Sequence, residues 1–268
     1  MRIKANGISM NYEVIGNGRW LTLIHGAGTN LNMWYNQVPV FSQHYQVLTY
    51  DYRGHGQTEL PEGELTTELW VEDLYTLLKV LNISETILLG FSMGGAIAIG
   101  FVLAHPEMVK ALILSNSGGI GAAQRSEEEI RQMEASRQAR IETVKKGGMA
   151  ALVEEGIGST FSPGFAEKNP DTVERYQSIR LQNDPDGYVR VLQRMSRPTT
   201  PPDLSKITCP TLIIAQEPDP SSGAADKTIQ EAIRGSQLKT FPTQHYTALE
   251  QPQEYNETVL SFLARIGE

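Results

Sequence analysis

The chain of 268 residues has one cysteine, no long apolar run and no excess of positive charge. A lone Cys209 excludes an internal disulfide. The longest apolar stretch, 96–104, is far shorter than the roughly 20 residues of a membrane-spanning helix, and the first residues lack the apolar core of a signal peptide. The 31 acidic residues outnumber the 23 basic ones, and the net charge of −8 repels nucleic acid and anionic lipid. We expect a soluble, cytoplasmic protein without a nucleic-acid or membrane partner.

Metal-binding patterns are also missing from the sequence. The five histidines, at positions 25, 44, 55, 105 and 245, show no i, i+4 pair and no CxxC companion. A zinc site therefore has no support. We expect an activity that needs no metal and no cofactor, and the sequence carries no signal for an oligomeric state.

Short apolar runs alternate with segments of helical length or with turns. The runs cover 20–24, 47–50, 87–89, 112–114, 212–215 and 238–241. Helices are expected at 66–81, 96–104, 224–233 and 252–266, the first of them with an apolar face and a threonine cap. Strands that helices cover on both sides are continuously apolar. The alternation predicts an α/β fold with a mostly parallel central sheet and helices on both faces.

Residues 122–205 have a different character, because charged helical segments dominate and no convincing strand occurs. One amphipathic stripe consists of Ile130, Met133, Ile141 and Val144, and a second covers 149–157. The proline-rich stretch RPTTPPDLSK then leads into the next strand. We predict an inserted helical cap at 122–205 and a core domain formed by 1–121 and 206–268.

One serine stands between two apolar runs in the stretch ILLGFSMGG, residues 87–95. Gly90 and Gly94 flank Ser92 in the pattern G-x-S-x-G, where missing side chains let a strand and a helix approach while a strained turn exposes the hydroxyl. The N-terminus of the following helix favours negative charge at the same point. Ser92 is thus a candidate nucleophile, although a glycine-rich turn with a capping serine gives the same pattern. The neighbouring motifs decide between the two.

A nucleophilic serine needs a base and an orienting acid. His245 lies in a loop between the last short strand and the last helix, at the carboxyl edge of the sheet where Ser92 also emerges. We predict it as the base. The loop after strand 212–215 contains Glu217 and Asp219, either of which can hold the imidazole. Asp219 is favoured because it lies deeper in the loop, between two prolines.

The negative oxygen of an acyl-transfer reaction needs backbone N–H donors. The stretch HGAG at 25–28 ends an early strand, and its small residues let the backbone approach a ligand. We predict an oxyanion hole formed by the N–H groups of Ala27 and of Met93, which follows Ser92.

These motifs closely resemble those of the α/β-hydrolase superfamily: HGAG at 25–28, DYRGHG at 51–56, GFSMGG at 90–95, PTLIIAQEPD at 210–219 and QHYTALEQP at 244–252. The order serine, aspartate, histidine is also the order of that family. The first 120 residues look most like 3-oxoadipate enol-lactonases and neighbouring small esterases. The resemblance implies the α/β-hydrolase fold. It also implies that Asp51, Arg53 and His55 lock the loop beside the oxyanion strand and are not a second catalytic cluster.

The combined features predict a cofactor-independent serine hydrolase that cleaves a carboxylic ester, thioester or lactone of a small molecule. Ser92, His245 and Asp219 would form its triad and pass through an acyl-enzyme. Two alternatives keep the fold: hydrolysis of a carbon–carbon bond or perhydrolysis, and a receptor that senses a small molecule with slow turnover. Turnover of esters, enol-lactones and vinylogous diketones distinguishes these possibilities.

Overall fold

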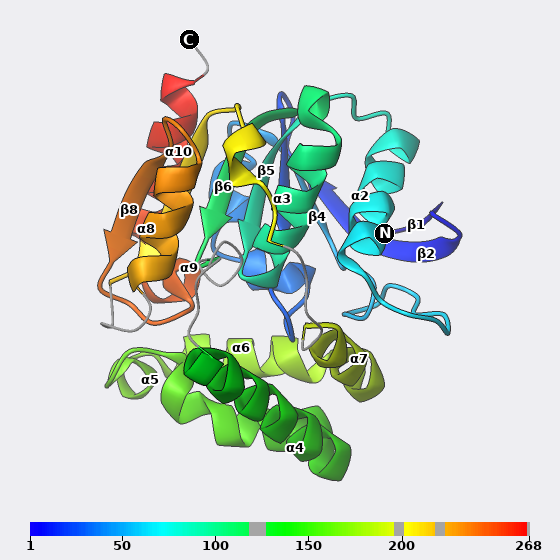
Figure 1. The fold of residues 1–268 in the computed structure, drawn as a ribbon, viewed down its shortest axis with the longest axis vertical. Helices are drawn as coiled ribbons and strands as arrows, with labels where there is room; N and C mark the ends of the chain where they lie inside the picture. The colour runs from blue at the N-terminus through cyan, green and yellow to red at the C-terminus, as the bar shows by residue number, and fades with distance from the viewer. Residues whose placement is uncertain (118–126, 196–200, 218–222, 267–268) are drawn as a thin grey trace.

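The computed structural model describes residues 1–117, 127–195, 201–217 and 223–266. Its centre is an eight-stranded sheet with the strand order β1-β2-β4-β3-β5-β6-β7-β8 (Figure 1). The strands are β1 Arg2–Ala5, β2 Ile8–Ile15, β3 Trp20–Ile24, β4 Gln46–Tyr50, β5 Thr86–Phe91, β6 Val109–Ser115, β7 Thr211–Gln216 and β8 Gln237–Phe241. From β4 across to β8 every neighbouring pair of strands is parallel. The pairs β1-β2 and β2-β4 are antiparallel. The predicted, mostly parallel sheet is confirmed.

The hairpin of β1 and β2 adds an edge that the apolar runs from residue 20 onward do not predict. Its turn consists of Asn6 and Gly7, whose φ angles are 47° and 76°. Ala5 and Ile8 face each other across the turn. Two successive residues with positive φ form the tight connection whose twist matches that of antiparallel strands. The hairpin extends the sheet on the side away from β8.

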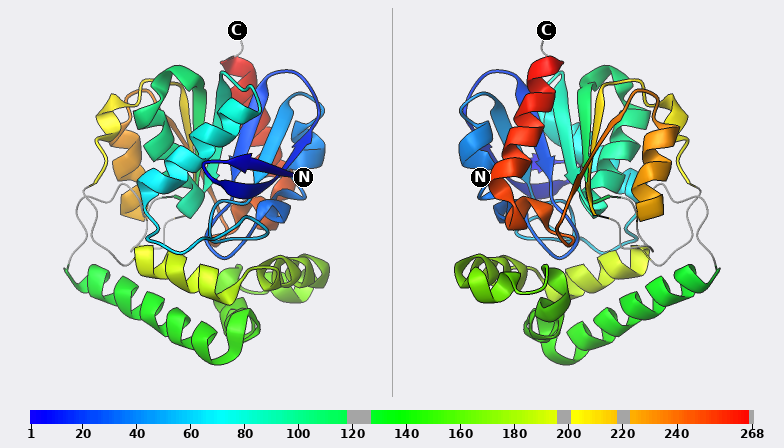
Figure 2. Two further views of the ribbon diagram at one scale, coloured as in Figure 1. Left: turned by 90° about the vertical axis from the view of Figure 1, so that its right-hand side faces the viewer. Right: turned by 90° about the vertical axis from the view of Figure 1, so that its left-hand side faces the viewer.

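Helices cover both faces of the sheet (Figures 1 and 2). One apolar cluster joins the sheet to α2, α3 and α8, and a second joins it to α1, α9 and α10. The helices are α1 Val38–Phe41, α2 Thr67–Val80, α3 Met93–Ala104, α8 Gly223–Ala232, α9 Thr247–Glu250 and α10 Pro252–Arg265, with single turns at η1 Leu31–Trp34, η2 Pro106–Met108 and η3 Leu204–Lys206. Burial from both sides explains why all six residues of β5 are apolar or small and buried.

The remaining helices lie together beyond one end of the sheet, with α4 outermost (Figure 2). They are α4 Glu127–Thr160, α5 Phe165–Lys168, α6 Pro170–Leu181 and α7 Pro185–Met195. α4 bends at Gly148, where φ is 67°. Ile141 and Val144 pack on α7 in a small apolar cluster, whereas Ile130 of the same predicted stripe is exposed. None of the helices in the described ranges is long and apolar enough to cross a bilayer.

Candidate active site

Ser92 lies on the turn that joins β5 to α3, with φ 52° and ψ −116°. A non-glycine residue in this region carries strain of about 1–3 kcal/mol and persists only where its surroundings hold it. Two backbone hydrogen bonds do so: the Ser92 N–H donates to Ser115 O at 2.9 Å, and the Gly95 N–H donates to Ser92 O at 2.9 Å. The turn therefore places the Ser92 hydroxyl just beyond the carboxyl end of β5.

Both glycines of G-x-S-x-G are required by close backbone contacts. A Cβ on Gly90 would lie 2.7 Å from Gly95 Cα and closer still to the Gly94 carbonyl oxygen. A Cβ on Gly94 would meet the carbonyl oxygen of Ile24 and would lie 2.6 Å from that of His25. Real Cβ atoms do not approach backbone atoms so closely, so α3 can cross the ends of β3 and β5 only with glycine at both positions.

His245 faces the serine from the loop between β8 and α9. Its Nε2 lies 3.0 Å from Ser92 Oγ, and its ring packs beside Phe91 at a centroid distance of 5.0 Å. Burial, and secondly the positive charge of Arg140 on α4, lowers the pKa of the imidazole to about 4. The ring is therefore neutral at pH 7, and with its proton on Nδ1 its Nε2 can accept the serine proton.

The predicted acid, Asp219, lies outside the described residues. Its alternative, Glu217, follows β7 directly, and its N–H donates to Phe241 O at 2.6 Å. The side chain of Glu217 is exposed and makes no hydrogen bond or ion pair with a described residue. Asp219 therefore stays a prediction for the orienting carboxylate.

The HGAG loop after β3 lies against the serine turn. A Cβ on Gly26 would be 3.2 Å from Ser92 Cβ, so the backbone at Gly26 lies close to the serine side chain. Gly28 has φ 75°, and its N–H donates to His55 Nε2 at 2.8 Å. The N–H groups of Ala27 and Met93 donate to no acceptor among the described residues. Both predicted oxyanion donors thus lie on segments that adjoin Ser92 and have no protein partner there.

The DYRGHG segment holds this loop in place. The Asp51 carboxylate accepts from Leu31 N–H at 2.8 Å and from Gln57 N–H at 2.9 Å. Arg53 is buried and forms two hydrogen bonds with the buried Asp73, at 2.8 Å and 2.6 Å. Burial, followed by the charges of His25 and Arg180, lowers the pKa of His55 well below its ordinary value, so the ring stays a neutral acceptor for Gly28. The structure supports the loop-locking interpretation.

The end of α6 and the residues that follow it are hydrogen-bonded to the HGAG loop and to Asn30 just after it. Asn183 donates through Nδ2 to Gly28 O at 3.2 Å, and its Oδ1 accepts from Gly56 N–H at 2.8 Å. Asn30 donates to the carbonyl oxygen of Ile179 at 3.0 Å. The sequence gives no signal for these contacts, because they join asparagines to backbone atoms far away in the chain. They hold the end of α6 against the loop that follows β3 and carries Ala27.

Glu250 of α9 links the helical layer to the histidine loop. Its carboxylate accepts from Ser162 N–H at 3.0 Å and from Gln244 N–H at 2.9 Å. Gln244 precedes His245, so one side chain fixes both the segment between α4 and α5 and the loop that carries the imidazole. The motif QHYTALEQP predicted a role for the histidine alone, and the two hydrogen bonds of Glu250 were not predicted.

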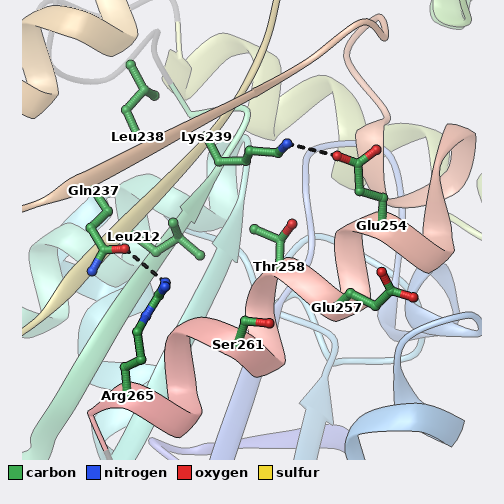
Figure 3. A pocket seen from close by; sticks show the side chains of 9 residues that line it. All are labelled: Leu212, Gln237, Leu238, Lys239, Glu254, Glu257, Thr258, Ser261 and Arg265. Carbon is green, nitrogen blue, oxygen red and sulfur yellow. Dashed lines mark hydrogen bonds and ion pairs between the residues drawn. The ribbon is translucent and has the colours of Figure 1, made fainter.

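A separate cavity of about 450 Å³ lies between β8 and α10, and Figure 3 shows the side chains that line it. Lys239 forms an ion pair with Glu254 at 2.8 Å, and Arg265 donates to Gln237 at 3.1 Å. No residue of the Ser92 cluster lines this cavity. Among the described residues, no group of three His, Cys, Asp or Glu side chains is arranged to hold a metal ion.

Comparison with known proteins places this arrangement in a family. Residues 19–250 match the family model of the alpha/beta hydrolase fold. The chain is 30% identical over 269 residues to 3-oxoadipate enol-lactonase 2 of Acinetobacter baylyi, covering 99% of this chain and 97% of that one. The crystal structure of the enol-lactonase from Burkholderia xenovorans LB400 is similar with a TM-score of 0.87 at 26% identity, over 98% of this chain and 100% of that one. A thermophilic esterase from Thermogutta terrifontis is similar with a TM-score of 0.86 at 25% identity, over 99% of both chains. The chain belongs to the α/β-hydrolase family.

Proposed function

We propose that the protein is a serine hydrolase that cleaves a carboxylic ester, thioester or lactone of a small molecule. The observation that carries the proposal is the 3.0 Å contact between His245 Nε2 and Ser92 Oγ at a strained strand-to-helix turn. A hydroxyl next to a neutral imidazole is the pairing that nucleophilic catalysis needs. The named activities of the similar proteins, enol-lactonase and esterase, support an ester or lactone bond as the target.

In this mechanism Ser92 Oγ attacks the carbonyl carbon while His245 takes the hydroxyl proton. The negative oxygen accepts hydrogen bonds from the N–H groups of Ala27 and Met93, each of which contributes about a hundred- to a thousand-fold in rate. His245 then gives its proton to the leaving oxygen, and a water that His245 activates releases the acid from Ser92. Asp219 holds the Nδ1 proton and stabilises the imidazolium.

We assign residues 122–205 to a cap that selects the substrate. The contacts of α6 with the HGAG loop, through Asn183 and Asn30, support this assignment. A helix in that position limits the size of the group that can reach Ser92. Apolar side chains dominate most pockets for small ligands, and a few polar groups orient the ligand.

Labelling with a fluorophosphonate tests the proposal directly, since the reagent reacts only with an activated serine. We expect one modified peptide, the one that contains Ser92, and no labelling of Ser92→Ala. The same variant should fold normally and lose ester turnover by several orders of magnitude. Labelling at another serine, or near-full turnover by Ser92→Ala, would contradict the proposal.

A further inference from the structure

A pair of threonine hydroxyls closes the loop that carries His245. Thr243 lies two positions before the histidine and Thr247 two positions after it. Their Oγ1 atoms are 2.8 Å apart, and both side chains are buried. The hydrogen bond between them therefore fixes the two ends of a short loop that has the imidazole at its centre.

Asn116, the residue after β6, connects this loop to the sheet. Its Nδ2 donates to Thr247 Oγ1 at 3.0 Å, and its Oδ1 accepts from the Ser115 hydroxyl at 3.1 Å. Its backbone N–H donates to Ile214 O of β7 at 2.7 Å. The φ angle of Asn116 is 49°, in the left-handed region that asparagine enters more readily than most residues. The amide is thus held by two strands and bonded to the first residue of α9.

The hydrogen bonds of these side chains run in one direction. An amide nitrogen only donates, so Thr247 Oγ1 accepts from Asn116. The Thr247 hydroxyl hydrogen then goes to Thr243, since no other acceptor for it occurs among the described residues. In such a buried chain each bond polarises the next, and a member that loses its partner stays unpaired away from water. The network therefore resists distortion.

The same strand end also holds the nucleophile. The carbonyl oxygen of Ser115 accepts the Ser92 N–H at 2.9 Å, and the next residue, Asn116, holds the histidine loop. Two adjacent residues at the end of β6 are therefore bonded to the two segments that meet at the 3.0 Å contact between Ser92 Oγ and His245 Nε2. A change in either bond would alter that distance.

We propose that Asn116 and Thr247 are positioning residues, which set the distance between the imidazole of His245 and the Ser92 hydroxyl. This inference rests on the proposed function, because the position of His245 affects the rate only if it takes the serine proton. Proton transfer needs the two heavy atoms within hydrogen-bond reach, and a displacement of about 1 Å costs about a hundredfold in rate. Asp219 would fix the tautomer of the ring, whereas Asn116 and Thr247 fix the loop.

Two isosteric variants test the inference. Thr247→Val removes the hydroxyl at the centre of the network. The matched control, Thr22→Val, removes one from a second buried pair, in which Thr22 Oγ1 of β3 lies 2.9 Å from Thr86 Oγ1 at the start of β5, the end of that strand away from Ser92. We expect similar decreases in the urea midpoint. Only Thr247→Val should lower kcat on a nitrophenyl ester, by about 10- to 100-fold with little change in KM.

Further variants separate positioning from a general loss of stability. Thr247→Ser keeps a hydroxyl and should recover most of the lost kcat. Asn116→Gly breaks the same link from its other end, and glycine adopts a φ angle of 49° without strain. Because the two changes break one link, the double variant Asn116→Gly, Thr247→Val should lose no more kcat than the slower single variant. Multiplied losses, no recovery in Thr247→Ser, or an equal loss in Thr22→Val would overturn the inference.

The rate of fluorophosphonate labelling distinguishes failure of this inference from failure of the proposed function, because it reports the activation of Ser92 without an ester substrate. Thr247→Val should be labelled about 10- to 100-fold more slowly than the wild type, and Thr22→Val at the wild-type rate. If the wild type is labelled at Ser92 and Thr247→Val reacts equally fast, only the inference fails. If Ser92 of the wild type is not labelled, the proposed function fails and the inference falls with it.

Discussion

The Nε2 atom of His245 and the Oγ atom of Ser92 lie 3.0 Å apart, although 153 positions separate them in the chain. The sheet brings them together, because β5 and β8 run in the same direction and both residues follow the carboxyl end of their strand. The serine turn is itself held in a strained conformation by Ser115 and Gly95.

Replacing Ser92 by glycine should stabilise the protein relative to Ser92→Ala by about 1 kcal/mol or more, because glycine adopts φ 52°, ψ −116° without strain. Both variants lose the hydroxyl and its contact with His245, so alanine is the matched control. Urea denaturation of the two variants measures the difference. Equal free energies of unfolding would show that the turn stores no strain at this residue.

Asp219→Asn should lower kcat by up to about 10⁴-fold, because an amide favours the wrong imidazole tautomer. Glu217→Gln should have a mild effect, since the Glu217 side chain is exposed. Steady-state kinetics with a nitrophenyl ester compares the two, with KM as a check that substrate binding is intact. The reverse ranking would assign the orienting role to Glu217.

His55→Phe should lower kcat by about 10- to 1,000-fold with a smaller change in KM, since the Gly28 N–H loses its acceptor and the oxyanion loop shifts. His55→Gln places a side-chain oxygen near the former Nε2 and should restore part of the lost kcat. Kinetics on an uncharged ester measure both variants. If glutamine is as damaging as phenylalanine, the hydrogen bond to Gly28 is not what positions the loop.

Acid should destabilise the protein through His25. Burial lowers the pKa of His25 from 6.5 to about 4, against the opposing charge of Asp51. Between these two pH values the unfolded chain binds the proton and the folded chain does not, so the free energy of unfolding falls as the pH falls. The loss is at most about 1.4 kcal/mol per pH unit for this one group and is absent above pH 6.5.

Urea midpoints from pH 7 to pH 4 test this dependence. His25→Gln removes one of three buried histidines whose pKa is lowered, the others being His55 and His245, and should reduce the slope in that window without abolishing it. The matched control is His44→Gln, because His44 is exposed, and its slope should equal that of the wild type. A wild-type slope in His25→Gln would mean that other groups cause the acid sensitivity.

The apolar runs in the sequence predicted the buried strands of the central sheet, because a short apolar segment between turn residues is enough to indicate such a strand. The strand expected at 20–24 agrees residue for residue with β3, since an apolar run between turn residues suits a buried parallel strand. The hairpin of β1 and β2 was also predictable, because Asn6-Gly7 between alternating residues is a strong hairpin signal. β2 is only half-buried, so it lacks the continuous apolar run that marks the central strands.

The parts of the site that depend on packing between distant segments were not predictable from pattern. Ser92 and His245 lie in sequence motifs that by themselves indicate catalysis, whereas Asn183 is an ordinary amide side chain in the segment after α6. Its importance arises only because it bonds to the backbone of Gly28 and Gly56, and no spacing in the sequence predicts these contacts. The same holds for Glu250, whose two backbone partners come from different segments.

The end of α10 offers a practical advantage. Arg265 there donates to Gln237, the first residue of β8, so the end of this helix lies at the edge of the sheet opposite to Ser92 (Figure 1). A linker joined beyond α10 would anchor the protein to a bead or a sensor chip with its reactive side facing the liquid. Immobilisation through this end should therefore leave diffusion of reactants to Ser92 unobstructed.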